Sequence, residues 1–293
     1  MNESIVAAFS LVLGTATPGG GFPVYGAAFT EVLNAQEQRL RIETRNTKGS
    51  TENVPLLEAG KLDLGLVAGE LASQVMLKPD TKLRVIAAMY ASPGMFVVKA
   101  DSPVRSIADL KGRPVVLGTQ GSGITVLGRT VLESLNIEVK PIVLEKAADG
   151  PPMLLDGRAA ALWGAGVGWP AFTSLAKSGA RFVAPNPSEI ASILKKNPQL
   201  QQVTLPAKSY PGQEAPIASV GSWSFVFARP DLPEGAGYLL ARAIHRSEAQ
   251  LGAKLEQAKE TTMANTLSAA PRALIHPGVL KYLGEAGIEG ARR

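Results

Sequence analysis

Three glycine-rich segments contain the residues whose types and spacing best suit ligand chemistry. They are "LVLGTATPGGGFPVYG" (11–26), "TKGSTEN" (47–53) and "VLGTQGSGITVLG" (116–128), and each is followed by a helical pattern. Backbone without side chains can approach a ligand closely, and the free N–H groups and dipole of the following helix favour negative charge. The sequence therefore predicts anion binding by backbone N–H groups at residues 14–21, 49–51 and 121–125.

The same segments do not fit the patterns of nucleotide-binding proteins or serine hydrolases. A phosphate loop needs a lysine after its last glycine, and the dinucleotide pattern GxGxxG is absent. In "TQGSG", Gln120 stands where a serine-hydrolase elbow has its first glycine. The two histidines, His245 and His276, lie away from clustered carboxylates and suit structural roles. We expect no enzyme activity, no metal site and no cofactor.

Composition indicates a soluble protein of two lobes. The chain has 293 residues, of which 45% are hydrophobic and 19% charged, enough to bury a sizeable core. There is no cysteine, which excludes disulfides and thiolate chemistry. The net charge of +5 comes from scattered Lys and Arg, and only 5% of residues are aromatic, so we expect no nucleic-acid partner. No apolar stretch is long enough for a membrane helix.

We expect that the first residues do not form a signal peptide. "MNES" carries Glu3 and no basic residue, although the apolar run after it has the length of a signal-peptide core. We expect residues 9–15 to be the first strand. If the protein is exported, its signal peptide is not part of this numbering.

A strand–loop–helix unit occurs twice. "VLGTATPGGGFPVYGAAFTEVLN" (12–34) and "VLGTQGSGITVLGRTVLESLN" (116–136) each run from an apolar strand through Leu-Gly-Thr and a glycine-rich turn to a helix ending in Leu-Asn. Alternating strands and helices predict an α/β fold with a mainly parallel sheet in each lobe and a ligand cleft between the lobes. We assign residues 1–100 and 221–293 to lobe I and 101–220 to lobe II, with hinges near 99–101 and 216–220.

Helical spacing predicts which faces are buried. In the first helix the predicted core positions are Val24, Ala27, Ala28 and Val32; in its counterpart they are Leu127, Val131 and Leu135.

Further candidates lie outside the glycine-rich turns. Lys48 could add a positive charge, although a solvated lysine explains it as well. Trp163 and Trp169 flank "GAGVG" and could form a wall of the ligand site or pack in the core. Tyr210 and Gln213 in "SYPGQEAP" could donate hydrogen bonds into the cleft or belong to a surface turn.

Five segments together resemble the solute receptors of TAXI-type TRAP transporters, which belong to the type II periplasmic binding-protein superfold. They are "GTATPGGGFPVYG", "TKGSTENVPLLEAGKLDLGLV", "ADSPVRSIADLKGRPVVLGTQGSGI", "SYPGQEAP" and "HPGVLKYLGEAG", in the same order along nearly the whole chain. The resemblance implies a periplasmic protein, most often a monomer. It would capture a small organic anion, commonly a carboxylate, and deliver it to the TRAP permease in the membrane.

The resemblance also implies ligand-binding positions. The implied first loop is Gly14, Thr15 and Gly20, Gly21 and Phe22, and the second is Gly49, Ser50 and Thr51, beside the separate candidate Lys48. The implied third loop is Gly121, Ser122, Gly123 and Thr125, with residues 163–166 (Trp163 to Gly166) and Tyr210 closing the site from the other lobe, and with Trp169 as a candidate from its position alone.

The chain departs from the family pattern at three places. Phe22 and Pro23 stand where the family usually has tyrosines, Lys48 replaces a glycine, and Ala160 replaces an acidic residue. Phe22 with Trp169 therefore suggests an acid that carries an apolar or aromatic part. A stand-alone ligand sensor that works with a signalling partner would share the fold and the cleft, and it stays open as the alternative.

Overall fold

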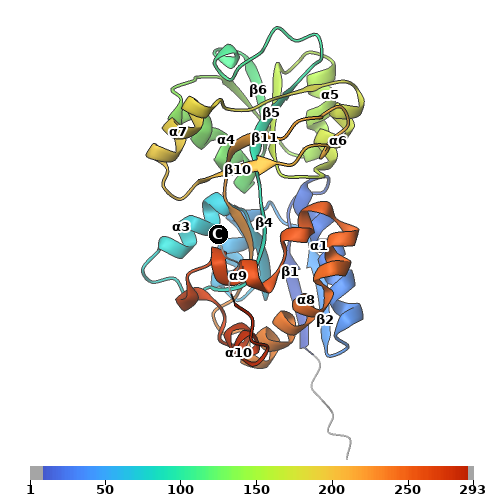
Figure 1. The fold of residues 1–293 in the computed structure, drawn as a ribbon, viewed down its shortest axis with the longest axis vertical. Helices are drawn as coiled ribbons and strands as arrows, with labels where there is room; N and C mark the ends of the chain where they lie inside the picture. Colours follow the sequence, from blue (N-terminus) through green and yellow to red (C-terminus); the bar gives the residue numbers. More distant parts are fainter. Residues whose placement is uncertain (1–8, 290–293) are drawn as a thin grey trace, which may run out of the picture.

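The computed structural model describes residues 9–289, which form two lobes stacked along the long axis (Figure 1). The N-terminal and C-terminal thirds of the chain build the first lobe, drawn in blue and orange-red below. The middle of the chain builds the second lobe, drawn in green and yellow above. The N-terminal segment 1–8, which the sequence analysis judged not to be a signal peptide, lies outside the described residues.

Twelve strands and ten α-helices make up these lobes. The strands are β1 (Phe9–Gly14), β2 (Leu40–Arg45), β3 (Leu64–Val67), β4 (Arg84–Ala91), β5 (Gly94–Val98), β6 (Pro114–Thr119), β7 (Lys140–Leu144), β8 (Ala161–Ala165), β9 (Arg181–Val183), β10 (Gln201–Leu205), β11 (Ile217–Gly221) and β12 (Trp223–Ala228), counted over residues 9–289.

Helices alternate with strands from β1 to β4 and again from β6 to β10, whereas within residues 84–119 no α-helix lies between β4, β5 and β6. They are α1 (Gly21–Gln36), α2 (Ser50–Glu58), α3 (Gly69–Leu77), α4 (Gly123–Ser134), α5 (Gly150–Leu155), α6 (Pro170–Lys177), α7 (Pro187–Lys196), α8 (Glu234–Lys254), α9 (Met263–Ala269) and α10 (Pro277–Glu285). Short 3₁₀ turns cover Ala108–Leu110, Ala147–Asp149, Glu256–Glu260 and Arg272–Leu274.

Each lobe contains one five-stranded sheet. The strand order is β2-β1-β3-β12-β4 in the first and β7-β6-β8-β5-β9 in the second, while β10 and β11 form a separate pair. The predicted α/β fold with two lobes is thus confirmed. In each sheet two neighbouring pairs are parallel, and the pairs that involve β12 or β5 are antiparallel.

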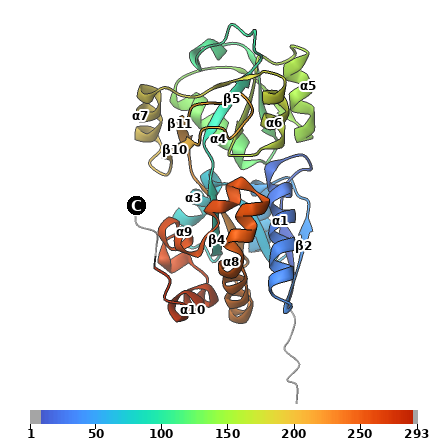
Figure 2. The same ribbon diagram turned by 45° about the vertical axis from the view of Figure 1, so that its right-hand side comes forward.

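The predicted core face of the first helix is right at Val32 but wrong at Val24 and Ala27, whereas that of the second helix is right at Leu127 and Val131, with Leu135 partly buried. In α1, Val24 is 38% exposed, whereas Tyr25, Phe29 and Leu33 are fully buried. The aromatic face of α1 is covered because α1 packs beside α8, a neighbour from the far end of the chain (Figure 2). In α4, Leu127 and Val131 are buried as expected.

Side-chain caps fix several of the helix starts. Ser122 accepts a hydrogen bond from the N–H of Ile124 at the start of α4. Asn186 and Glu189 form a reciprocal capping box at α7, which satisfies two otherwise free N–H groups. His276 caps α10 by accepting from the N–H of Gly278, and its buried ring also contacts the carbonyl of Leu232. This histidine has the structural role that the sequence suggested.

The chain crosses between the lobes at other residues than those expected. Strand β5 (Gly94–Val98), assigned from sequence to lobe I, pairs with β8 and β9 in the second sheet, so the first crossing lies at Ser92 and Pro93. The second crossing lies at Ser222, between β11 and β12. Strands β4 and β5 form an almost continuous apolar run from 85 to 98, which is interrupted only by Ser92, Pro93 and Gly94.

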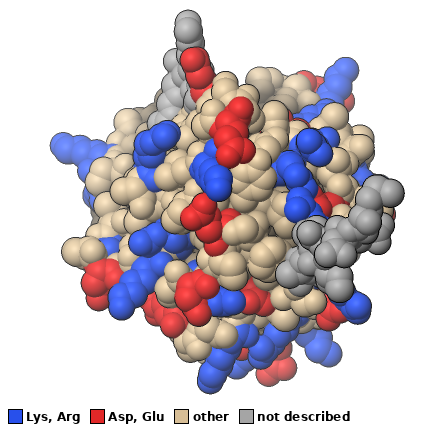
Figure 3. Space-filling view, turned by 90° about the horizontal axis from the view of Figure 1, so that it is seen from below, with Lys and Arg blue, Asp and Glu red and all other residues tan. Residues whose placement is uncertain are grey.

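Charged side chains of both signs intermingle on the end of the first lobe. Figure 3 shows Lys and Arg beside Asp and Glu, with no broad region of a single sign on this face. Within residues 9–289, no helix has both the length and the apolar character that spanning a bilayer requires.

One buried ion pair joins helix α1 to α8. The Glu37 side chain, 9% exposed, contacts the guanidinium groups of Arg39 and Arg242. Burial alone would raise the pKa of Glu37, but hydrogen bonds from these two arginines outweigh burial and lower the pKa to about 2. A carboxylate with a lowered pKa stabilises the folded state above its unfolded pKa, and this contribution disappears as the pH falls towards 2.

We expect the substitution Glu37→Gln to lower the free energy of unfolding at pH 7 by on the order of 2 kcal/mol. The difference from the wild type should shrink between pH 4.5 and 2, the window set by the unfolded and folded pKa values of Glu37. Urea unfolding measured across that range tests this. Glu43→Gln is the matched control, because its pair with Arg41 is exposed and should contribute little. Equal losses in both variants would contradict the assignment.

Candidate functional site

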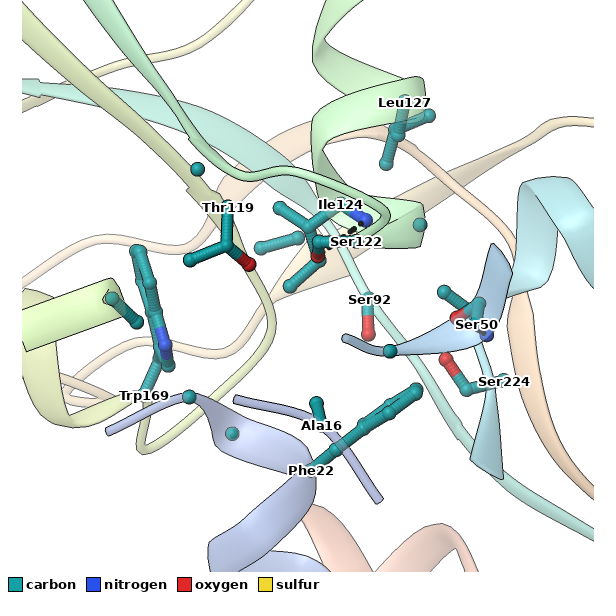
Figure 4. A pocket seen from close by; sticks show the side chains of 18 of the residues that line it. Ala16, Phe22, Ser50, Ser92, Thr119, Ser122, Ile124, Leu127, Trp169 and Ser224 are labelled. Atoms are coloured by element: carbon teal, nitrogen blue, oxygen red, sulfur yellow. Dashed lines mark hydrogen bonds between the residues drawn. The ribbon is translucent and has the colours of Figure 1, made fainter. Parts of the chain in front are cut away.

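A cavity lies between the two lobes, at the glycine-rich ends of strands from both sheets. The first lobe contributes the turns before α1 and α2 and the start of α3, and the second contributes β6, β8 and the start of α4. Side chains from both lobes converge there, with Trp169 on one side, Ser50 and Ser224 on the other, and Phe22 between them (Figure 4).

Most of the predicted glycine-rich residues line this cavity. The predicted residues in its wall are Gly20, Gly21, Phe22, Gly49, Ser50, Ser122, Gly123, Trp163 and Trp169. All three turns singled out from the sequence therefore meet at one place.

The remaining predicted residues lie beside the cavity rather than in its wall. Thr15 is buried and bonds to the carbonyl of Arg45, and Thr125 donates to the carbonyl of Thr119. Lys48 is exposed, and its backbone N–H donates to Glu52. The others outside the wall are Gly14, Thr51, Gly121, Gly166 and Tyr210.

Tyr210 positions the tryptophan instead of facing the ligand site. Its hydroxyl donates to the carbonyl of Gly166 at 2.9 Å and accepts from the N–H of Trp169 at 3.0 Å. Burial raises the pKa of Tyr210, so the hydroxyl keeps its proton for the first of these bonds. Tyr210 thus fixes the loop that carries Trp169.

The indole N–H of Trp169 is buried without a partner. Trp169 is 8% exposed, and its Nε1 has no hydrogen-bond acceptor among the described residues. The ring lies against the first turn of α1, since a Cβ placed on Gly21 would be 3.5 Å from Trp169 Cδ1. A buried donor without a partner costs roughly 1–3 kcal/mol, which a bound acceptor can offset.

The N-terminus of α1 provides further donors next to that indole. Its first turn has no acidic residue, and within residues 9–289 no side chain caps it at Gly20. The N–H groups of a first helical turn have no acceptor inside the helix, and the dipole of this 16-residue helix favours a negative charge there. Gly20, Gly21 and Phe22 all line the cavity, so this corner is suited to an anionic or hydrogen-bond-accepting group.

Trp163 has a mixed role. Its ring is fully buried in the core of the second lobe, 4.7 Å from Phe96 between ring centroids, and also lines the cavity. Its Nε1 donates to the carbonyl of Ile124 at 2.8 Å and so holds the start of α4 in place.

The lobes touch each other directly beside the cavity. The carbonyl oxygen of Gly121 in the second lobe accepts two hydrogen bonds from Thr51 in the first, from the N–H at 3.1 Å and from Oγ1 at 2.7 Å. Gly49 and Gly121 have φ angles of 101° and 81°, a region that favours glycine. The structure therefore has its lobes closed on each other.

Several cavity residues were missed by the sequence analysis. They include Glu70 at the start of α3, Tyr90 at the end of β4, and the hydroxyl groups of Ser92, Ser222 and Ser224 near the crossings. Burial raises the pKa of Tyr90, which keeps this phenol protonated. Glu70 is the one charged side chain among the described residues that line the cavity. No cluster of His, Asp or Glu in residues 9–289 is arranged to bind a metal ion.

Solved structures of binding proteins share this architecture. MatC from Rhodopseudomonas palustris, solved with bound malate, aligns with a TM-score of 0.61 at 14% identity, over 95% of this chain and 96% of that one. A TctC solute-binding protein from Polaromonas aligns with a TM-score of 0.55 at 17% identity, over 98% and 99%. The substrate-binding protein of an amino acid ABC transporter aligns with a TM-score of 0.53 at 16% identity, over 86% and 98%. The fold is that of the periplasmic binding proteins, as the sequence predicted.

The family is also shown at the level of sequence. Residues 13–287 match the model of the NMT1-like family, so the chain belongs to that family.

Removing only the indole N–H should weaken ligand binding. Trp169→Phe keeps an aromatic ring in the wall but deletes the donor, so we expect the affinity for the ligand to fall about ten-fold. Isothermal titration with the acid that most stabilises the wild type measures this, and thermal unfolding without ligand checks that the variant folds. Unchanged affinity would mean that Nε1 does not contact the ligand.

Adding one methyl group at the lobe contact should hinder closure. A Cβ on Gly123 would collide with the Cβ of Ala68 in the other lobe and come within 3.0 Å of Ser50 Oγ. We therefore expect Gly123→Ala to enlarge the radius of gyration in X-ray scattering and to weaken ligand binding by about ten-fold or more. Gly284→Ala in α10 is the control, because nothing lies within 4 Å of its added Cβ. A compact Gly123→Ala protein with wild-type affinity would refute this expectation.

Proposed function

We propose that the chain is a periplasmic solute-binding receptor that captures a small organic anion, a carboxylate, between its lobes. The observation that carries the proposal is the corner formed by the uncapped N-terminus of α1 and the buried, unpartnered Nε1 of Trp169. Both supply hydrogen-bond donors to the same cavity. Within the described part of the chain, no side chain caps this helix start, and Trp169 Nε1 has no acceptor. Membership of the NMT1-like family and the binding-protein fold support the same proposal.

The apolar surroundings of this corner suggest the rest of the ligand. Phe22 and Trp169 line the cavity together with Leu127 and Leu162. An acid that carries an apolar or aromatic part would cover these side chains, in line with the departure from the family pattern at Phe22.

Delivery to a membrane partner completes the proposed function. The resemblance to the receptors of TAXI-type TRAP transporters suggests a TRAP permease as that partner. Closure would then turn about the two crossings, Ser92–Pro93 and Ser222, where single stretches of chain join the lobes. Such a protein binds its ligand and releases it unchanged.

A thermal-shift screen of the ligand-stripped protein tests the proposal. A ligand that binds only the folded state stabilises it by RT ln(1 + [L]/Kd), about 2.7 kcal/mol at a hundred times Kd. We expect shifts of several degrees from small carboxylic acids, aliphatic or aromatic, and none from neutral sugars or simple amines. Shifts from sugars or amines alone would overturn the organic-anion proposal.

A further inference from the structure

Glu70 is a buried carboxyl group with one oxygen left unsatisfied. The residue is 4% exposed and lines the cavity. Its Oε1 accepts a hydrogen bond from Nε2 of Gln199 at 3.1 Å, whereas Oε2 has no partner among the described residues. An unsatisfied buried carboxyl oxygen is costly, so its presence in a ligand cavity points to a group that the ligand supplies.

The position of Glu70 explains why a carboxyl group is tolerated there. It is the second residue of α3, where the helix dipole favours negative charge. No Lys, Arg or His is found among the described residues that line the cavity, so the wall itself offers no cation to pair with it. A ligand group with an N–H or O–H donor would satisfy Oε2, and an ammonium group would also balance its charge.

Glu70 and Trp169 face the cavity from different lobes and have opposite hydrogen-bonding character. Trp169 Nε1 is an unpartnered donor in the second lobe beside Gly21, and Glu70 Oε2 is an unpartnered acceptor in the first lobe. Glu70 lies two residues after Ala68, whose N–H donates to Ser50 Oγ at 2.9 Å. Ser50 lies across the cavity from Trp169 (Figure 4). A ligand with an acceptor at one end and a donor at the other would satisfy both groups.

We infer that Glu70 is a specificity-determining residue that binds a hydrogen-bond donor on the ligand. The site therefore prefers acids that carry an amino or hydroxyl group over the same acids without it. This inference rests on the proposed function for the acid end of the ligand. The bond from Gln199, which lies in the second lobe, means that Glu70 is held in place only when the lobes are closed.

Isothermal titration with matched acids tests the inference. The probes are alanine, lactate and propionate; aspartate, malate and succinate; and phenylalanine, phenyllactate and 3-phenylpropionate, with propylamine as a donor that lacks an acid. In the best-binding series, the wild type should favour the amino or hydroxy acid at least about ten-fold over the unsubstituted acid. Amino acids and hydroxy acids distinguish an ammonium donor from a hydroxyl donor.

Glu70→Gln should reduce that preference to within about three-fold, because the amide keeps the shape but loses the charge. Gln199→Ala is the matched control: it removes the bond to Oε1 and one contact between the lobes but keeps the Glu70 carboxyl group, so it should weaken all members of a series alike. Circular dichroism and thermal unfolding check that both variants fold.

Two outcomes overturn the inference: a wild type that binds unsubstituted acids as tightly as substituted ones, or a Glu70→Gln protein with its preference intact. The proposed function fails separately. If propylamine binds in a way that depends on Glu70 and no acid binds, the inference about Glu70 holds. The proposed binding of a carboxylate is then wrong. If no probe binds, both fall together.

Discussion

The structure depends on one point of contact, where the backbone carbonyl of Gly121 in one lobe receives both the N–H and the hydroxyl of Thr51 in the other. Two main chains can come this close only because Gly49 and Gly121 have no side chains and adopt positive φ angles. The contact holds the two lobes together beside the cavity, in whose wall Trp169 and Glu70 are both buried. Burial makes the indole and the carboxyl group selective for particular ligands, because a buried polar group without a hydrogen-bond partner is costly.

Much of the fold could be predicted from the sequence, since its signals are local and repeated. The two copies of the strand–loop–helix unit predicted two similar lobes, and both were found. The buried face of α1 could not be read from periodicity alone, because small and β-branched residues occur on both sides of that helix. Tyr25 and Phe29, four residues apart, were the better signal, but only the packing of α8 shows that their side is covered. The first lobe crossing was missed because Pro93 and Gly94 interrupt the apolar run so briefly.

The parts of the candidate site that consist of backbone in glycine-rich turns could be predicted from the sequence. The parts that depend on contacts between residues distant in the sequence were missed. Glycine-rich turns before helices can be recognised along the chain, and they converge as expected. Glu70 gave no such signal, because an acidic residue in the first turn of a helix has an ordinary explanation in the helix dipole. That Oε2 of Glu70 lacks a partner among the described residues can be seen only in the structure, where Gln199, distant in the sequence, donates to Oε1 instead. Tyr210 shows the converse case, since it was predicted as a ligand donor and instead holds the Trp169 loop.

The position of β12 has a consequence for how the chain acquires its structure. This strand lies between β3 and β4 in the first sheet, although the whole second lobe separates it from them along the chain. Until residues 223–228 arrive, β3 and β4 have no strand to join them, and the hydrogen-bonding edges of both stay open. The second lobe is contiguous from β5 to β11 and needs no such distant segment. Folding should therefore be complete first in the inserted lobe, and the first lobe should assemble last, around a strand that closes its sheet from within.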